Sequence, residues 1–399
     1  MNDQQQQELI DKLFGAHNRR DFLKRAGALG LSGAALTAFL EACGSTSIAT
    51  GSTTASVNLN GPISVGTLAT NAKKEGTLQA VGITPEWANY SQILSSYAAK
   101  YVPIDYKADS EFSSAQEVEV FKQSKQHAYG DIADVGFKWG PVVIQQGLVS
   151  PYKHSYWNDV PDDQKDPNGM WCTEYWGAQS FVVNTDVVKN PPKSFSDLLT
   201  GDYKNMVGID GDPRQATDAF MAVYSAALAK TGNTDSIQPG IDFFAALKKK
   251  GNFTPARANE ANLVKGEVGI GIIWDYLGLG YRDKYASSKP NFSVVIPTDG
   301  AVAGPYILIV NKTAPHPYAA RLWSEYIFSD EGQLAFLKGY AHPIRYQKLA
   351  DAGKIPADLA AKLPSATEYA NVKFISDITK LTTASNVLTQ NWQSQVLGQ

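Results

Sequence analysis

The sequence predicts an α/β fold built from two successive units. Short β-prone runs alternate with capped helices from about residue 63, and a second alternation begins near Asn190, after a proline-led turn. Such alternation is typical of strand–helix–strand units, so mostly parallel sheets are expected. The 399 residues, 43% of them hydrophobic, are enough for two domains with separate cores.

The first unit consists of strands and two well-marked helices. Residues 85–101 carry apolar side chains at helical spacing and open with Thr84-Pro85, which is a cap followed by a first-turn proline. Residues 113–126 open with the Ser-x-x-Gln capping pattern at Ser113. We expect strands at residues 76–83, 102–109, 131–139 and 177–185.

The second unit repeats this alternation without an internal sequence repeat. Apolar periodicity predicts helices over residues 218–230 and 241–250, and residues 266–274 read as a buried strand. Residues 291–312 then supply further strands, and the remainder of the chain is predicted to be helical.

The N-terminal 42 residues have the features of an export signal. Arg19 and Arg20 precede a weakly apolar run over 26–40, which is too short for a comfortable membrane span. The paired arginines resemble a twin-arginine signal, and residues 40–44 resemble a lipobox in which the thiol of Cys43 is acylated. The alternative is an uncleaved N-terminal anchor helix. Residues 43–65, rich in Ser, Thr and Gly, are expected to be a flexible tether.

Four stretches carry a resemblance to a known family. Residues 72–90, 131–153, 191–209 and 314–336 resemble the extracellular solute-binding proteins of ABC importers, in the branch with polyamine-, iron- and aminophosphonate-type receptors. The resemblance implies a two-lobed fold of the periplasmic-binding-protein type (type II), with the ligand cleft between the lobes. Lobe 1 is expected to contain residues 66–180 and 300–399, and lobe 2 residues 181–299. The crossovers are expected at 177–185 and 295–304.

Composition and motifs argue against several other classes of protein. The net charge of −3 gives no basic footprint for nucleic acid. Nucleophile-elbow, zincin, P-loop and Cys-x-x-Cys motifs are missing from the sequence. The five histidines lack ligand spacing, so neither a metal site nor a cofactor is expected. Cys172 is expected to be an inert buried thiol.

The candidate ligand-binding residues follow apolar strands, because α/β proteins bind ligands beyond the carboxyl ends of strands. Asp275 is a candidate partner for an ammonium group, or else the N-cap of the next helix. Arg214 suits an anionic group, or else forms a surface ion pair. The other candidates, whose alternative role is in the core, are Trp87, Lys138, Trp139, Tyr175, Trp176, Trp274, Tyr276 and Tyr306.

These features together predict a monomeric, membrane-tethered receptor that delivers a small solute to an ABC permease and performs no chemistry. The expected solute contains an amine, as in a polyamine, an amino acid or an aminophosphonate. One alternative is a receptor for ferric iron or an iron chelate, with Tyr281 and Tyr285 as the suggestive pair. An alternative from another class is an exported enzyme.

Overall fold

The computed structural model describes residue 59 and residues 63–106, 113–124 and 128–398. The strands within these ranges run in the order β2-β1-β3-β8-β4-β6-β5, with β10 beside β8 and with β7 and β9 beside β4. Their bounds are β1 (Leu78–Val81), β2 (Ile104–Tyr106), β3 (Ile132–Gly136), β4 (Cys172–Asn184), β5 (Val207–Ile209), β6 (Ile270–Trp274), β7 (Phe292–Val295), β8 (Ala301–Val310), β9 (His342–Pro343) and β10 (Val372–Phe374).

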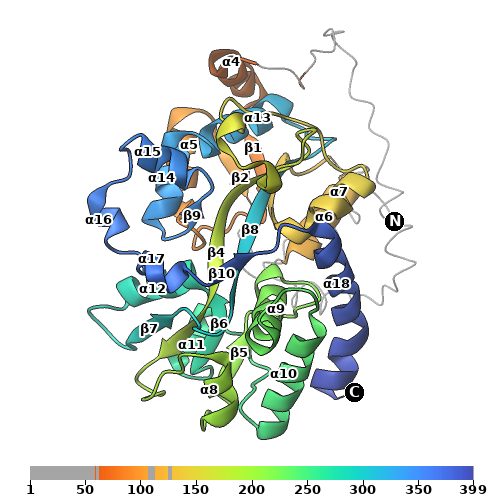
Figure 1. Cartoon of the computed structure of the whole chain (residues 1–399). Coiled ribbons are helices and arrows are strands. Elements are labelled where there is room, and N and C mark those ends of the chain that lie inside the picture. The colour runs from red at the N-terminus through yellow and green to blue at the C-terminus, as the bar shows by residue number, and fades with distance from the viewer. Residues whose placement is uncertain (1–58, 60–62, 107–112, 125–127, 399) are drawn as a thin grey trace, which may run out of the picture. The chain divides into compact units, whose positions relative to one another are not determined.

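Helices surround these strands and confirm the predicted α/β fold class (Figure 1). Their bounds are α4 (Val65–Glu75), α5 (Tyr90–Lys100), α6 (Ser114–Gln123), α7 (Gly140–Gln145), α8 (Phe195–Thr200), α9 (Thr217–Thr231), α10 (Gln238–Lys250), α11 (Glu260–Lys265), α12 (Asp275–Lys284), α13 (Pro317–Ile327), α14 (Asp330–Lys338), α15 (Tyr346–Asp351), α16 (Ala357–Ala360), α17 (Ala366–Tyr369) and α18 (Ile378–Trp392).

The predicted cap at Ser113 forms, whereas the predicted cap at Thr84 does not, because helix α5 starts later than expected. The backbone N–H of Ser113 donates to Gln116 Oε1 at 2.9 Å, which completes the capping box of α6. Helix α5 begins at Tyr90 rather than at residue 85, because residues 84–89 form a turn in which Ala88 and Asn89 have positive φ angles. A non-glycine residue in that region interrupts a helix. Trp87 therefore lies on a turn and not on a helix face.

The sheet is mixed, whereas mostly parallel pairing was expected. Strand β1 pairs in parallel with β2 and β3, and β5 pairs in parallel with β6. The long strands β4 and β8 run antiparallel to each other, and they also pair antiparallel with β6 and β3 respectively. The antiparallel pairs involve β4 and β8, whose partners are distant in the sequence. The local sequence pattern does not reveal the direction of such pairs.

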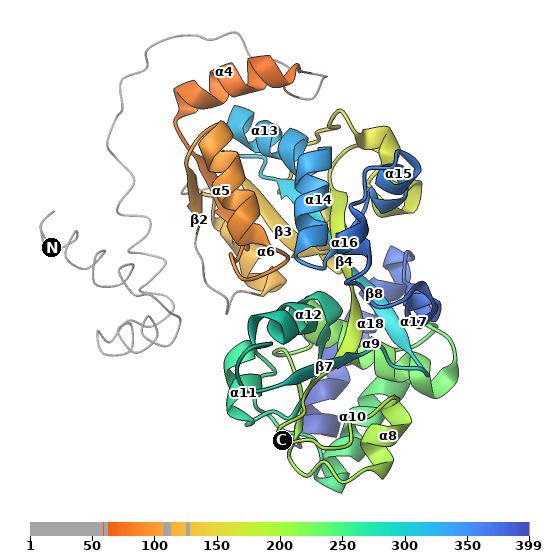
Figure 2. The same ribbon diagram turned by 90° about the vertical axis from the view of Figure 1, so that its left-hand side faces the viewer.

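Strand β4 hydrogen-bonds to two different groups of strands. Its first half, residues 172–178, pairs with β8, while residues 179–184 pair with β6 and β7. Figure 2 shows β4 passing between an upper set of helices that includes α5, α13 and α14 and a lower set that includes α8, α10 and α11. The change of partners in β4 thus falls within residues 177–185, and β8 runs antiparallel to the first half of β4 from Ala301.

The last helix packs on the lower set of helices. Trp392 of α18 lies 5.5 Å from the ring of Phe244 in α10, measured between centroids, and Lys248 Nζ donates to the carbonyl of Leu397 at 2.7 Å. The expected lobe 1 included residues 300–399, so this packing gives the C-terminal helix a neighbour from the other expected lobe. Trp392 and Phe244 are far apart in the sequence, so no local sequence pattern predicts their contact.

The export signal, Cys43 and most of the tether lie outside the described residues. Within the described ranges, no helix has both the length and the apolar character needed to cross a membrane.

Candidate functional site

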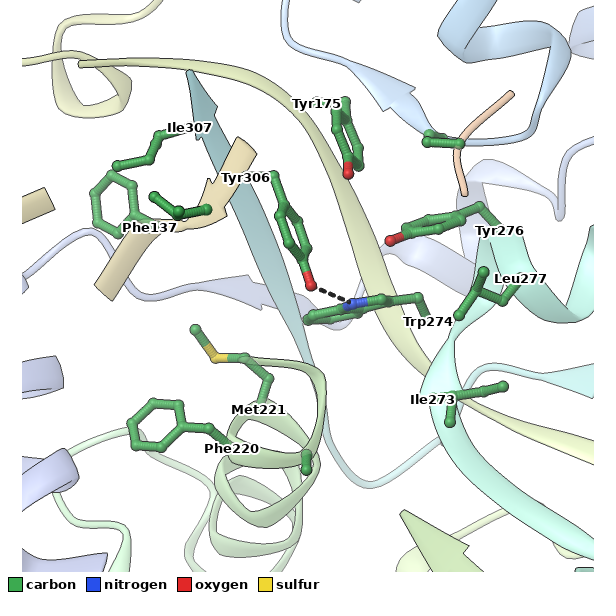
Figure 3. Close-up of a cluster of buried hydrophobic side chains, with 14 of the residues drawn as sticks. Phe137, Tyr175, Phe220, Met221, Ile273, Trp274, Tyr276, Leu277, Tyr306 and Ile307 are labelled. Carbon is green, nitrogen blue, oxygen red and sulfur yellow. Dashed lines mark hydrogen bonds between the residues drawn. The ribbon is translucent and has the colours of Figure 1, made fainter. Parts of the chain in front are cut away.

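Five of the predicted site residues come together where β4 and β8 run side by side. The ring of Tyr175 stacks on that of Tyr306 with centroids 5.4 Å apart, and Tyr276 meets Tyr175 edge-on at 6.0 Å. Trp87 lies 5.9 Å from Tyr306 and 6.3 Å from Tyr276. Figure 3 shows four of these side chains. We call the following group the aromatic cluster: Trp87, Tyr175, Trp274, Tyr276 and Tyr306.

Two glycines make room for the aromatic cluster. Gly177 of β4 and Gly304 of β8 are partners in register. A Cβ atom on Gly304 would lie 1.8 Å from Cη2 of Trp274, and one on Gly177 would lie 2.6 Å from Cε1 of Tyr276. The rings of Trp274 and Tyr276 therefore occupy the space that side chains at Gly304 and Gly177 would fill.

The polar ends of the cluster differ in their partners. Trp274 Nε1 donates to Tyr306 Oη at 3.2 Å, and Tyr175 Oη donates to Asp134 Oδ2 at 2.9 Å. Tyr276 Oη is buried and has no hydrogen-bond partner among the described residues. Burial raises the pKa of all three phenols well above the ordinary value, so each hydroxyl keeps its proton.

A cavity of about 560 Å³ opens beside Trp87. Its volume is within the range of small-molecule sites. The turn after β1 contributes Glu86 and Trp87, and α11 and α12 contribute Glu260, Tyr281 and Tyr285. Trp87 lines this cavity and is also a member of the aromatic cluster, so the two features share one side chain.

The polar side chains around the cavity have both signs of charge. Arg257 Nε donates to Asp210 Oδ1, and Tyr285 Oη donates to Glu260 Oε1 at 2.7 Å. Lys265 also lines the cavity. The wall therefore offers hydrogen-bond groups for both a cationic and an anionic part of a solute.

Asp275 is fully buried and its carboxylate contacts groups of the protein. Oδ1 accepts from the backbone N–H of Ala178 at 2.9 Å, and Oδ2 lies 2.6 Å from Tyr369 Oη and 3.1 Å from His342 Nε2. The side chain does not cap α12, because Asp275 is already the first residue of that helix. A ligand role for Asp275 remains a hypothesis.

Trp176 shares a neighbour with Asp275. Its ring stacks on His342 with centroids 3.9 Å apart and meets Phe374 at 4.9 Å. Adjacent strand residues point to opposite faces, so Trp176 points away from the face that Tyr175 occupies. The structure thus groups Trp176 and Asp275 around His342, and it groups Tyr175 with the aromatic cluster.

Lys138 and Trp139 follow β3 in a short 3₁₀ turn. Lys138 Nζ lies 4.2 Å from the ring centroid of Phe220 in α9 and 5.6 Å from that of Trp139. The ammonium nitrogen is buried and has no hydrogen-bond partner within the described part of the chain. Burial lowers the pKa of Lys138 to about 7. The negative charge of Asp212 opposes this shift.

Replacing Lys138 by methionine is expected to remove a pH dependence of stability. The native pKa near 7 lies below the unfolded value, so the unfolded chain binds more protons between about pH 7 and pH 10. The free energy of unfolding should therefore rise with pH across that range, and rise less in Lys138→Met. Urea titrations of both proteins at several pH values measure this, and parallel curves would contradict it.

Arg214 lies apart from the aromatic cluster. Its guanidinium binds Asp212 through Nε at 2.9 Å and Nη2 at 2.6 Å, and Nη1 donates to Gln393 Oε1 at 3.1 Å. The hydrogen bond and the charge of Asp212 raise the pKa of Arg214. Arg214 thus forms an ion pair with Asp212, which was the alternative to an anion-binding role.

Sequence reasoning missed the acidic groups next to the aromatic cluster. Asp134 lies within the buried strand β3, Glu117 in α6 and Asp218 in the first turn of α9, and all three side chains are buried. An aspartate inside the apolar stretch 132–136 was the available signal, because a buried carboxyl group needs partners.

The comparison with protein families agrees with the arrangement described above. Residues 131–377, more than half of the chain, match the family model described as bacterial extracellular solute-binding protein. The chain belongs to this family. Its expected place of action is therefore outside the cytoplasm, and the two-lobed fold with a solute site is the family's architecture.

Among curated proteins, this solute-binding protein is similar to relatives from Salmonella. It is 24% identical over 201 residues to the "Putative 2-aminoethylphosphonate-binding periplasmic protein" of Salmonella typhimurium, which covers 48% of this chain and 57% of the relative. The protein of the same name from Salmonella typhi is 25% identical over 203 residues, with the same coverage. The match thus spans a little over half the length of these relatives.

Solved structures with the same fold bind different solutes. The periplasmic binding protein AfuA of Actinobacillus pleuropneumoniae, with fructose-6-phosphate bound, has a TM-score of 0.65 at 16% identity and covers 80% of this chain and 99% of its own. Iron-bound HitA of Pseudomonas aeruginosa has a TM-score of 0.57 at 16% identity and covers 78% and 99%. These likenesses support the two-lobed fold alone.

Among the described residues, no three side chains of His, Cys, Asp or Glu are grouped so that they can hold a metal ion.

Proposed function

We propose that this protein is the solute-binding component of an ABC importer and that it captures a small amine-containing solute. The observation that carries the proposal is the cavity of about 560 Å³ that Trp87 joins to the aromatic cluster, in a chain of the solute-binding family. Lobe 1 is proposed to contain residues 66–180 and 300–399, and lobe 2 residues 181–299. The protein acts by binding, with a permease as its partner, and no catalytic step is involved.

The amine follows from the chemistry around the site. Aromatic rings attract ammonium groups by about 0.5–2 kcal/mol each, and carboxyl groups supply the hydrogen-bond acceptors. The Salmonella relatives carry the name of a solute that contains an amine. The cavity wall also contains Arg257 and Lys265, which suit an anionic end such as a carboxylate or phosphonate.

A thermal-shift panel tests this function directly. Polyamines, amino acids, aminophosphonates and ferric citrate are each added to the purified protein. A ligand that binds only the native state stabilises it by about 2.7 kcal/mol at 100 times its Kd, so the true class should raise the melting temperature. A shift with ferric citrate alone would favour the iron alternative, in which Tyr281 and Tyr285 of the cavity wall supply oxygen ligands. A panel without any shift would contradict the receptor.

We further propose that Cys43 is acylated after twin-arginine export and that residues 43–65 tether a monomeric body to the membrane. In that case Cys43→Ala should move the protein from the membrane fraction to the soluble fraction, because the lipid is the only anchor proposed. Fractionation followed by immunoblotting measures this, with Cys172→Ala as the matched control that keeps the lipobox. A Cys43→Ala protein that stays with the membrane would favour an uncleaved anchor helix.

A further inference from the structure

Four buried acidic side chains in the described part of the chain have oxygens without partners, namely Glu174 and three whose charges act on Tyr306 of the aromatic cluster. Glu117, Asp134 and Asp218 are each no more than 5% exposed. Glu117 Oε2, Asp134 Oδ1 and Asp218 Oδ2 have no hydrogen-bond partner among the described residues. A buried oxygen of this kind is costly unless something else supplies a donor.

The three elements that carry these carboxyl groups meet, because the N–H of Gly136 in β3 donates to Ser114 Oγ of α6 at 3.1 Å and that oxygen lies 3.3 Å from Thr217 Oγ1 of α9. After burial, the charges of Asp218, Asp134 and Glu117 all contribute to the raised pKa of Tyr306, so each acts on that one hydroxyl. Asp218 and Asp134 likewise raise the pKa of Tyr276. Because Tyr276 Oη is itself buried without a partner, a fourth unused polar atom belongs to the group. In Figure 3 the hydroxyls of Tyr175, Tyr276 and Tyr306 point toward one region of the cluster.

The other oxygen of two of these carboxyl groups is held firmly. Asp134 Oδ2 accepts from Tyr90 Oη at 3.0 Å and from Tyr175 Oη at 2.9 Å. Asp218 Oδ1 accepts from Gln179 Nε2 at 2.5 Å. These bonds fix the carboxyl groups and leave the remaining oxygens free for a ligand, an arrangement that is typical of a preorganised site.

The third carboxyl group is fixed by packing. A Cβ atom on Gly82 would lie 2.4 Å from Cδ of Glu117, so the carboxyl group fills the space next to that glycine. Burial raises the pKa of Glu117 and Asp218 well above the ordinary value and that of Asp134 to about 7. The positive charge of Arg257 acts against the raised pKa of Asp218.

We infer that these carboxyl groups form a buried cation subsite, which takes a primary ammonium or guanidinium group of the solute. The inference rests on the proposed solute-binding function and names the chemical group that the site recognises. The cation donates to the free oxygens of Glu117, Asp134 and Asp218, with the rings of Trp87, Tyr276 and Tyr306 around it. The remainder of the solute extends into the cavity of about 560 Å³.

Trp87 is the side chain that the cavity shares with the aromatic cluster. It contacts both, and it lies on the turn in which Ala88 and Asn89 adopt positive φ angles. Strained non-glycine residues of this kind cluster at ligand-binding sites.

Calorimetry with matched probes tests the inference on the full chain. The probes are putrescine, agmatine and 2-aminoethylphosphonate, paired with 1,4-butanediol and ethylphosphonate, which lack the cation. The amine probes should bind, and Asp218→Asn and Glu117→Gln should each weaken their binding by about 10-fold to 150-fold, the range of a charge-assisted hydrogen bond. Glu119→Gln, which removes an exposed acid of α6 that pairs with Lys122 and does not line the cavity, should change the Kd less than about 3-fold.

The outcomes separate the inference from the function on which it rests. Amine binding that survives both substitutions overturns the cation subsite and leaves the receptor in place. Binding of ethylphosphonate as tight as that of 2-aminoethylphosphonate does the same. If no probe of either class binds, the amine receptor itself is contradicted. Equal melting temperatures of the variants and wild type exclude misfolding, because the amide substitutions conserve shape.

Discussion

Replacing Asp275 by alanine should lower the free energy of unfolding by about 3–5 kcal/mol, the cost of breaking a buried pair. The substitution leaves His342, the hydroxyl of Tyr369 and the backbone N–H of Ala178 without their shared acceptor. Urea denaturation measures the loss. Asp358→Ala, at an exposed position in α16, is the matched control and should change stability by less than about 0.5 kcal/mol.

The milder Asp275→Asn separates stability from binding. If Asp275 acts through His342 and Tyr369, the asparagine protein is less stable but keeps its affinity for the amine probes. A folded Asp275→Asn protein that has lost that affinity would establish the carboxylate as a ligand for the solute. A loss in Asp275→Ala below about 1 kcal/mol would show that the three bonds add little to folding.

Replacing Gly304 by alanine should cost about 3 kcal/mol, the upper part of the range for overpacking a core. The added methyl group would meet Cη2 of Trp274 at 1.8 Å, and the indole is fully buried with no room to turn. The aromatic cluster should shift with it, so near-ultraviolet circular dichroism should change as well.

Gly280 provides the control for this substitution. It lies in α12, and a Cβ atom there would meet nothing within 4 Å. Gly280→Ala should raise the free energy of unfolding by about 0.8–1 kcal/mol through helix propensity. If Gly304→Ala unfolded at the same urea concentration as wild type, the close packing of Trp274 on β8 would be contradicted.

Local sequence patterns were sufficient for most elements. The capping box at Ser113 forms as expected. Ser329 likewise caps α14, with its Oγ accepting from the N–H of Gly332 at 3.2 Å. Both depend on residues three positions apart, which a sequence displays directly. The late start of α5 at Tyr90 was not predictable, because its cause is the backbone conformation of the preceding turn.

The candidate site was predictable in its aromatic part and not in its acidic part. Trp274, Tyr276 and Tyr306 follow or lie in apolar strands, so their positions at the crossing strands could be expected. Their meeting with Asp134 and Asp218 depends on pairings between strands far apart in sequence. The spacing of residues along the sequence does not show which distant strands pair with each other.

The position of α18 has a consequence for the order in which the protein folds during synthesis. Its Trp392 covers Phe244 of α10 and lies 6.5 Å from the ring of Phe253, measured between centroids. Until residues 378–397 have left the ribosome, those rings remain open to water, and a nascent chain in that condition is prone to aggregation. The aromatic packing on α10 is therefore completed only after α18 has been synthesised.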